Sequence, residues 1–281
     1  MVMLRFELAF LRGDDVEMSR QATRARGRSG SETWMSLRQA FVLFYAGRAR
    51  EARGVLRRAM TEAELGSQNE RAALWQASTA VREAWLGNLP QARQAARTAM
   101  QIVPSREVQY GAALAFGLAG ETATAQKIAH NLESEYPRDT CVQFNYLPVL
   151  RARLALSRAE SLSALEALQV AAPYEDGITW SVASGLFGAM YPVYLRGEAY
   201  LAQKQGKKAA FEFQKILDHP GIVVTDPVGA LARFQLARAW SMEGDSKKAK
   251  TAYENFFALW KDADPNIPVL VQAKAEYHKL K

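Results

Sequence analysis

The chain has 281 residues, of which 49% are hydrophobic and 23% charged, and its formal net charge at pH 7 is +7. This composition is typical of a folded protein, and the length is near the upper limit for one compact core, so we expect two domains or a solenoid. The single cysteine, Cys141, excludes an internal disulfide scaffold. His130, His219 and His278 lie far apart in the sequence, which argues against a dedicated zinc site.

The first helix pair is predicted at residues 4–12 and 16–25. Charged residues stand among the apolar residues of its first helix, so the N-terminus lacks the continuous apolar stretch of a signal peptide. Residues 1–60 hold 12 arginines and 6 acidic residues, and their net charge of +6 accounts for almost all of the chain's net positive charge. Within them lies a cluster of four cations: Arg20, Arg24, Arg26 and Arg28. We interpret this cluster as a solvated linker, and nucleic-acid or anion binding there is the alternative function.

The next three helix pairs share one pattern, in which small residues stand where the two helices meet and a glycine stands in the turn between them. In the last two of these pairs a proline follows the second helix. The three pairs are predicted at 32–46 with 51–64, 70–86 with 91–102, and 107–118 with 122–135. Glycines stand in the turns because they adopt a positive φ at little cost. We expect these turns at Gly47, Gly87 and Gly120.

The later pairs depart from this pattern in their turns. In the fifth pair Ala159 stands where the turn glycine belongs, and Pro148 lies near the start of the first helix. Residues 172–178 are the best place for a seam between two subdomains, 1–171 and 179–281. In the sixth pair Gly206 comes two residues late, so we expect a longer first helix or a larger turn. The seventh pair turns at Gly244, and residues 267–280 form a terminal capping helix.

The last two pairs carry the pattern most legibly, because their small and aromatic residues fall in matching slots. The first copy has Gly197, Ala199, Tyr200, Gly206, Ala209 and Phe213, and the second has Ala237, Trp240, Gly244, Ala249, Tyr253 and Phe256. This arrangement resembles the tetratricopeptide repeat (TPR), which has a period of roughly 34 residues. The resemblance implies an all-α fold: a right-handed superhelical solenoid of about six to seven antiparallel helix pairs with a capping helix. It also implies a non-catalytic scaffold for protein–protein interaction.

A narrower resemblance covers about a third of the chain. Residues 190–201, 213–222, 226–231, 259–268 and 273–277 resemble the C-terminal TPR region of bacterial eukaryotic-like serine/threonine protein kinases. Similar regions also follow DNA-binding domains in bacterial regulators. The resemblance implies a regulatory or sensing module of a kinase or transcription regulator, and it does not imply phosphotransfer, because the chain has neither an HRD nor a DFG triplet.

No catalytic motif is found, so we expect no enzyme, no cofactor and no metal. The sequence contains no P-loop, no HExxH and no nucleophile elbow. Acidic pairs such as Asp14 and Asp15 fall in turns, where they cap helices.

The resemblance instead implies a partner-binding groove on the concave side, formed by the first helix of each pair. By register, the groove holds Trp34, Phe41, Tyr45, Trp85, Tyr110, Tyr146, Arg153, Tyr191, Tyr194, Glu198, Phe234 and Arg238. An apolar, tyrosine-rich groove suits a peptide or a partner helix. The competing interpretation is that several of these side chains, Phe41 among them, pack between repeats.

The uncharged stretch 177–195 is long enough to span a membrane, but its glycines, serines and proline favour a loop followed by a half-buried helix. We therefore expect no membrane insertion and a cytoplasmic location by default. An extracytoplasmic location would follow if the repeats came after a membrane anchor in a longer protein.

Overall fold

A computed structural model describes residues 1–28, 30–65, 68–177 and 185–280, and in these ranges the chain is helical without a strand. The helices of the first half are α1 (Val2–Arg12), α2 (Asp15–Ala25), α3 (Ser31–Tyr45), α4 (Ala49–Leu65), α5 (Asn69–Trp85), α6 (Leu89–Ile102), α7 (Arg106–Leu118) and α8 (Thr122–Glu135). Those of the second half are the π-helical turn η1 (Val142–Tyr146), α9 (Leu147–Ser157), α10 (Ser161–Gln169), the 3₁₀ turn η2 (Ala172–Tyr174), α12 (Tyr191–Ala202), α13 (Gly206–Asp218), α14 (Pro220–Val223), α15 (Pro227–Met242), α16 (Ser246–Leu259) and α17 (Pro268–His278).

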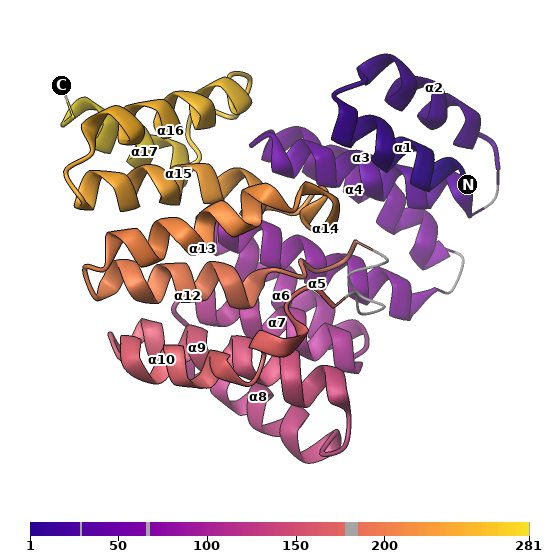
Figure 1. The fold of residues 1–281 in the computed structure, drawn as a ribbon. Coiled ribbons are helices and arrows are strands. Elements are labelled where there is room, and N and C mark those ends of the chain that lie inside the picture. Colours follow the sequence, from indigo (N-terminus) through magenta and orange to yellow (C-terminus); the bar gives the residue numbers. More distant parts are fainter. Residues whose placement is uncertain (29, 66–67, 178–184, 281) are drawn as a thin grey trace.

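The helices are arranged as successive antiparallel pairs that stack on one another (Figure 1). This is the predicted all-α solenoid of helix pairs. In each pair an inner helix (α3, α5, α7, α9, α12 or α15) packs against the outer helix that follows it in the chain. From α5 onwards each inner helix also packs against the next inner helix, and α3 meets α5 through the edge-on contact of Trp34 with Trp75 at 5.7 Å, which makes the stack continuous.

The turns inside the pairs share one backbone conformation. Gly47, Gly87, Gly120 and Gly244 have φ values of 73°, 82°, 82° and 76°, so these glycines take the positive φ expected of a turn. The two irregular turns reach the same conformation without glycine, because Ala159 and Lys204 have φ values of 61° and 59°. A side chain with a Cβ is strained there, so these two turns carry a small energetic cost.

Gly206 is not the turn residue of its pair. It begins α13, and a Cβ at this position would lie 2.7 Å from the carbonyl oxygen of Ala239 on α15. The delay of two residues noted in the sequence therefore has two causes: Lys204 makes the turn, and Gly206 lets α13 approach α15 closely.

Two of the inner helices, α5 and α7, are buried on all sides over most of their length. In α5 every residue from Ala77 to Trp85 is buried, and in α7 every residue from Glu107 to Gly117 is buried. A helix that exposes one face would show burial with the helical period instead. Around α5 and α7 the concave side of the stack is therefore filled.

Residues 185–190 supply much of this filling. Phe187 packs edge-on against Tyr110 with ring centroids 5.3 Å apart, and a Cβ on Gly111 would lie 2.5 Å from the Phe187 ring. Leu186 and Met190 are also fully buried. Of the stretch that could have spanned a membrane, residues 178–184 lie outside the described ranges, and among the described helices none is long and apolar enough to cross a bilayer.

The C-terminal region closes the stack by binding turns that lie far away in the sequence. Trp260 donates a hydrogen bond from Nε1 to the carbonyl oxygen of Tyr45 at 2.9 Å. The Asp264 carboxylate accepts hydrogen bonds from the backbone N–H and the Nε of Arg50 at 2.8 and 3.1 Å. The turn at Gly47 is in close contact with this region, since a Cβ there would lie 2.7 Å from the Cβ of Ala263.

Residues 172–177, next to the predicted seam, bind to the second half of the chain. Glu175 is 4% exposed and forms ion pairs with Arg196 of α12 and, at 2.9 Å, with Lys215 of α13. Arg196 also binds Glu212 at 2.8 Å. The division at 172–178 stays a prediction, and residue 178 lies outside the described ranges.

Candidate functional site

The side chains predicted for the concave groove fall into two groups. Seven are buried: Phe41, Trp85, Tyr110, Tyr146, Tyr191, Tyr194 and Phe234. The other five are half-buried: Trp34, Tyr45, Arg153, Glu198 and Arg238. Partner binding by this set stays a prediction, and in this structure only the second group has accessible surface to offer a partner.

The buried group is an aromatic core that joins different pairs. The rings of Tyr110 and Tyr146 stack with centroids 3.8 Å apart, and Trp85 meets Tyr194 edge-on at 4.9 Å. The hydroxyl of Tyr191 donates to the Asp226 carboxylate at 2.8 Å, while that of Tyr194 accepts from the Gln235 amide at 3.0 Å. Burial, together with the charge of nearby Asp226, raises the pKa of Tyr191 well above its ordinary value, so its hydroxyl stays protonated.

Arg82 is a central residue of this core that the sequence analysis did not single out. It is 1% exposed, and it donates hydrogen bonds to the carbonyl oxygens of Leu186 and Gly185 at 2.7 and 2.8 Å. Its guanidinium also lies 3.5 Å from the centroid of the Phe41 ring. The sequence does contain a signal, since Arg82 follows Val81 on a helix whose other residues are mostly apolar or small.

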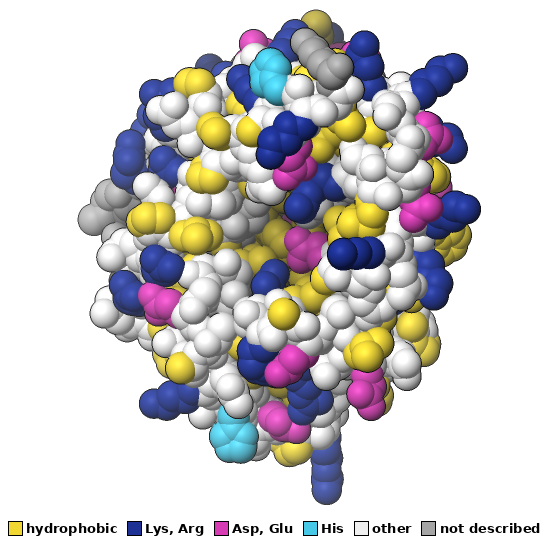
Figure 2. All heavy atoms as spheres, turned by 90° about the vertical axis from the view of Figure 1, so that its left-hand side faces the viewer, with side chains coloured by type: hydrophobic (Ala, Val, Ile, Leu, Met, Phe, Trp, Pro, Cys, Tyr) yellow, Lys and Arg dark blue, Asp and Glu magenta, His cyan; other side chains and the backbone are white. Residues whose placement is uncertain are grey.

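An open cavity remains where the C-terminal ends of α12 and α15 face α17, and we call it the mouth pocket. It has a volume of about 730 Å³. Its lining comprises Glu198, Leu201, Ala202, Lys204, Arg238, Ser241, Met242, Tyr253, Glu276, Lys279 and Leu280. The ends of α12 and α15 lie on the left in Figure 1, and Figure 2 shows that side face-on, hollowed near its middle, with hydrophobic side chains around acidic and basic ones.

Charged groups of both signs converge on the mouth pocket. Arg238 lies 3.3 Å from Glu276, which also accepts a hydrogen bond from the Tyr253 hydroxyl at 2.9 Å. Oε1 of Glu198 accepts from Gln235 at 3.3 Å, while Oε2 lies 3.6 Å from Arg153 and accepts no hydrogen bond from the described residues. Burial raises the pKa of Glu198, and the two arginines oppose this effect. Oε2 is itself buried, so within the pocket the charged groups that face a ligand are Arg238 and Glu276.

The N-terminal arginines lie apart from the mouth pocket. Arg20 and Arg24 are exposed on α2, and Arg26 and Arg28 are exposed in the segment after it. Arg20 forms an ion pair with Glu17, one turn away on the same helix. Arg20 and Arg24 thus belong to a helix and only Arg26 and Arg28 to the link that follows it, and nucleic-acid binding by these residues stays a prediction.

The described residues contain no group of three His, Cys, Asp or Glu side chains that could hold a metal ion. Cys141 is half-buried, and burial raises the pKa of its thiol, which disfavours the reactive thiolate.

Comparison of the sequence with protein-family models and with curated proteins finds no match. Solved structures with similar folds exist. A tetratricopeptide repeat protein from Parabacteroides merdae ATCC 43184 aligns over 99% of this chain and 97% of its own, with a TM-score of 0.54 and 12% identity. Yeast Tom70 aligns over 96% of this chain and 60% of its own, again with a TM-score of 0.54 and 12% identity. At this identity the likeness shows the fold alone, and the fold is that of tetratricopeptide-repeat proteins.

Proposed function

We propose that this chain is a non-catalytic scaffold that binds a segment of another protein, and that the mouth pocket is its binding site. One observation carries the proposal: the mouth pocket is an open cavity of about 730 Å³ in which apolar side chains surround Glu198, Arg238 and Glu276. Pockets of this size that combine apolar walls with a few converging polar groups are typical of binding sites. Met242 adds a flexible apolar side chain, 42% exposed, at the edge of the pocket.

The lining favours a peptide that has an apolar side chain next to polar groups. The apolar side chain would pack against Leu201, Met242 and Leu280, which line the pocket. Polar groups on the peptide would pair with Arg238 and Glu276, which also line the pocket. Such a ligand gains both burial of apolar area and charge-assisted hydrogen bonds.

The resemblance to TPR regions of bacterial serine/threonine kinases suggests a finer role for the same site, namely regulation or sensing for a kinase or transcription regulator. This role predicts that the captured partner belongs to a signalling or transcription complex. Identification of the partner by mass spectrometry tests it separately from the binding itself.

The test of the binding site is a cross-linked pull-down from the native lysate with the wild type and a Met242→Glu variant. Met242→Glu places a charge in the apolar part of the pocket, so we expect the partner to be lost. The matched control is Val271→Glu on α17, since Val271 is also an exposed apolar residue, at 52%, but does not line the pocket. Equal recovery by both variants would show that the mouth pocket is not the binding site. The tyrosines Tyr191 and Tyr194 are unsuitable for this test because they belong to the core.

A further inference from the structure

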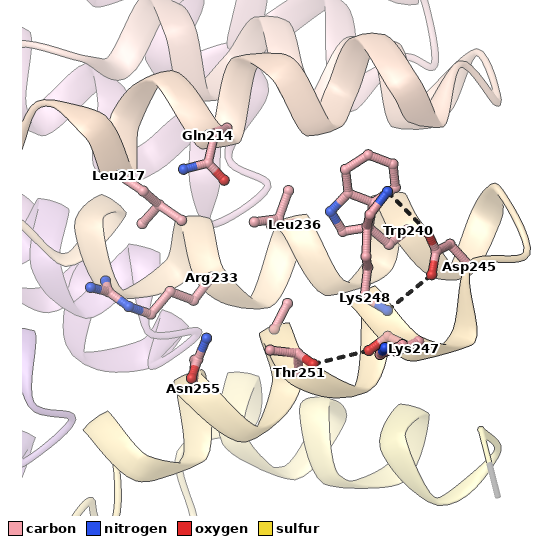
Figure 3. A pocket seen from close by; sticks show the side chains of 11 residues that line it. Gln214, Leu217, Arg233, Leu236, Trp240, Asp245, Lys247, Lys248, Thr251 and Asn255 are labelled. Atoms are coloured by element: carbon pink, nitrogen blue, oxygen red, sulfur yellow. Dashed lines mark hydrogen bonds and ion pairs between the residues drawn. The ribbon is translucent and has the colours of Figure 1, made fainter.

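A second cavity lies on the opposite, outer side of α15, between α13 and α16, and we call it the α15 groove. Its volume is about 610 Å³. Figure 3 shows its floor on α15, with Arg233, Leu236 and Trp240, and its two walls, with Gln214 and Leu217 on α13 and with Lys247, Lys248, Thr251 and Asn255 on α16. The groove runs along α15, so a partner of matching shape would be elongated.

The floor of the α15 groove continues into a neighbouring cavity. That cavity, of about 360 Å³, lies between the first helix pair and α13–α15, and Leu217 and Arg233 line both. Along α15 the two cavities use residues 229, 233, 236 and 240, a spacing that places them on one face of the helix. At 1.5 Å per residue this face is about 17 Å long, which is about three turns of a helix laid beside it.

Apolar side chains are exposed in and beside the α15 groove. Leu217 and Trp240 are half-buried in its lining. Phe211, three residues before Gln214 and therefore on a neighbouring part of the same face of α13, is 70% exposed. An exposed aromatic ring beside an apolar groove is typical of a protein-binding surface.

The charge of the α15 groove is positive. It contains Arg233, Lys247 and Lys248, and the one acidic residue in its described lining is Asp245. The chain already uses this carboxylate, which caps α16 by accepting from the Lys248 backbone at 3.0 Å and binds the Lys248 ammonium at 3.1 Å. Arg233 donates to the Gly229 carbonyl at 2.6 Å, which fixes its position and leaves its charge uncompensated by that bond. The groove therefore favours a partner with carboxylates.

The equivalent groove over α5 shows how such a surface looks when the chain supplies the carboxylate itself. Glu83 stands nine residues before Ala92, as Trp240 stands nine before Ala249, so the two occupy the same slot of the repeat. Glu83 binds Arg53 of α4 in a bidentate pair at 2.5 and 2.8 Å. In the α15 groove tryptophan stands in the slot of this internal acid, and among the described residues Arg233 and Lys247 form no ion pair with a carboxylate, whereas Lys248 is paired with Asp245.

From these observations we infer that the α15 groove binds an amphipathic helix of another protein, one with apolar residues on one face and acidic residues on its flanks. The apolar face would pack on Trp240, Leu236 and Phe211, and the flanking carboxylates would bind Lys247 and Arg233. This is a second binding surface, separate from the mouth pocket and independent of it.

The test uses a fluorescein-labelled helical peptide of 16 residues, with leucines at an i, i+4, i+7, i+11 spacing and glutamates on the flanks. A second peptide has lysines in place of the glutamates. We expect the glutamate peptide to bind the wild type at least tenfold more tightly than the lysine peptide in fluorescence anisotropy. Equal binding of the two peptides, or binding of neither, would overturn the inference.

A pair of charge-reversal variants locates the binding. In Lys247→Glu/Lys248→Glu we expect the affinity for the glutamate peptide to fall at least tenfold. The control is Lys207→Glu/Lys208→Glu, which makes the same change of charge at the equivalent positions of α13; there Lys208 lies 5.5 Å from the Tyr200 ring, as Lys248 lies 4.3 Å from that of Trp240. We expect the control to change the affinity less than twofold.

Two results would overturn the inference. An equal loss of affinity in both variants would mean that net charge alone attracts the peptide. Tighter binding of a single-stranded oligonucleotide than of the peptide would assign the groove to nucleic acid. Circular dichroism confirms that each variant is folded.

Discussion

The two ends of the chain are attached to the body of the protein in different ways. The first pair, α1 and α2, forms a small separate core with α3, in which Phe6, Ala22 and Ala25 pack with Met35 of α3, while Leu4 and Leu8 are exposed. The last segment instead inserts Trp260 into the main core and binds the turn at Gly47 through Asp264. In a linear solenoid each pair would contact only its neighbours. The N-terminal pair is therefore held by contacts with its neighbours in the sequence, whereas the C-terminal segment is held by contacts with residues more than 200 positions away, which we call the closure.

The largest effect is expected from breaking the closure with Trp260→Ala. This change removes a buried ring that packs on Phe256 at 4.6 Å, together with its hydrogen bond to Tyr45. We expect the free energy of unfolding to fall by about 3–5 kcal/mol in urea denaturation. Trp260→Phe keeps most of the apolar area and should cost less. A loss below about 1 kcal/mol in Trp260→Ala would show that closure contributes little to stability.

Phe6→Ala tests the locally held end. Phe6 is buried in the small core, and we expect its loss to lower the opening free energy of α1 and α2 by about 3 kcal/mol. Hydrogen exchange measured by mass spectrometry should accelerate in residues 1–25 and remain unchanged in α15 and α16. If exchange accelerated equally in all of these helices, the first pair would not be an independent unit.

Glu175→Gln sharpens the comparison by testing the middle of the chain, which a buried charge network holds. Burial alone would raise the pKa of Glu175, but hydrogen bonds and charges from Arg196 and Lys215 lower it below the ordinary value of 4.5. A lowered pKa in the folded state stabilises the protein fully above pH 4.5 and less as the pH falls through the folded pKa. We expect the variant to be less stable than wild type by about 1–3 kcal/mol at pH 7, with the difference shrinking below pH 4.5. A difference that is independent of pH would exclude this ion-pair contribution.

The smallest effect concerns the two irregular turns, at Ala159 and Lys204, which lie outside both attachments. Lys204 has a φ of 59°, and Lys204→Gly removes the strain of its Cβ. We expect stabilisation by about 0.5–1 kcal/mol, because the relief of strain exceeds the entropic cost of glycine. Ala159→Gly should act in the same direction. Lower melting temperatures in both variants would show that these turns are unstrained.

The sequence was sufficient to predict the helix pairs and their turns. Glycine and small residues act locally, so Gly47, Gly87 and Gly244 mark the turns whatever surrounds them. The turn at Lys204 was not predicted, because the sequence pattern assigned the turn to the nearby Gly206. A positive φ at a residue other than glycine depends on how the neighbouring helices pack, which the local sequence does not record. The order of the helices was therefore predictable from the sequence, while the residue that takes the positive φ in an irregular turn was not.

The candidate site was predicted less completely, for a geometric reason. Register along a repeat indicates which residues face the concave side, but it does not indicate whether that side is open. Tyr191 lies where the register implies, yet it is fully buried because Trp85, Gly188 and Asp226 pack on it. The contact between Tyr45 and Trp260 spans 215 residues, and no local pattern records it. Glu198 and Arg238 remain accessible because they lie near the C-terminal ends of their helices.

The same separation has a consequence for synthesis on the ribosome. Tyr45 emerges 215 residues before its partner Trp260. At a translation rate of about 5–20 residues per second, α3 and α5 wait roughly 10–40 s for the segment that completes their packing. Throughout that interval the surface around Tyr45 and Gly47 lacks the segment that covers it, so the nascent chain should be a substrate for chaperones until its last helices have been made.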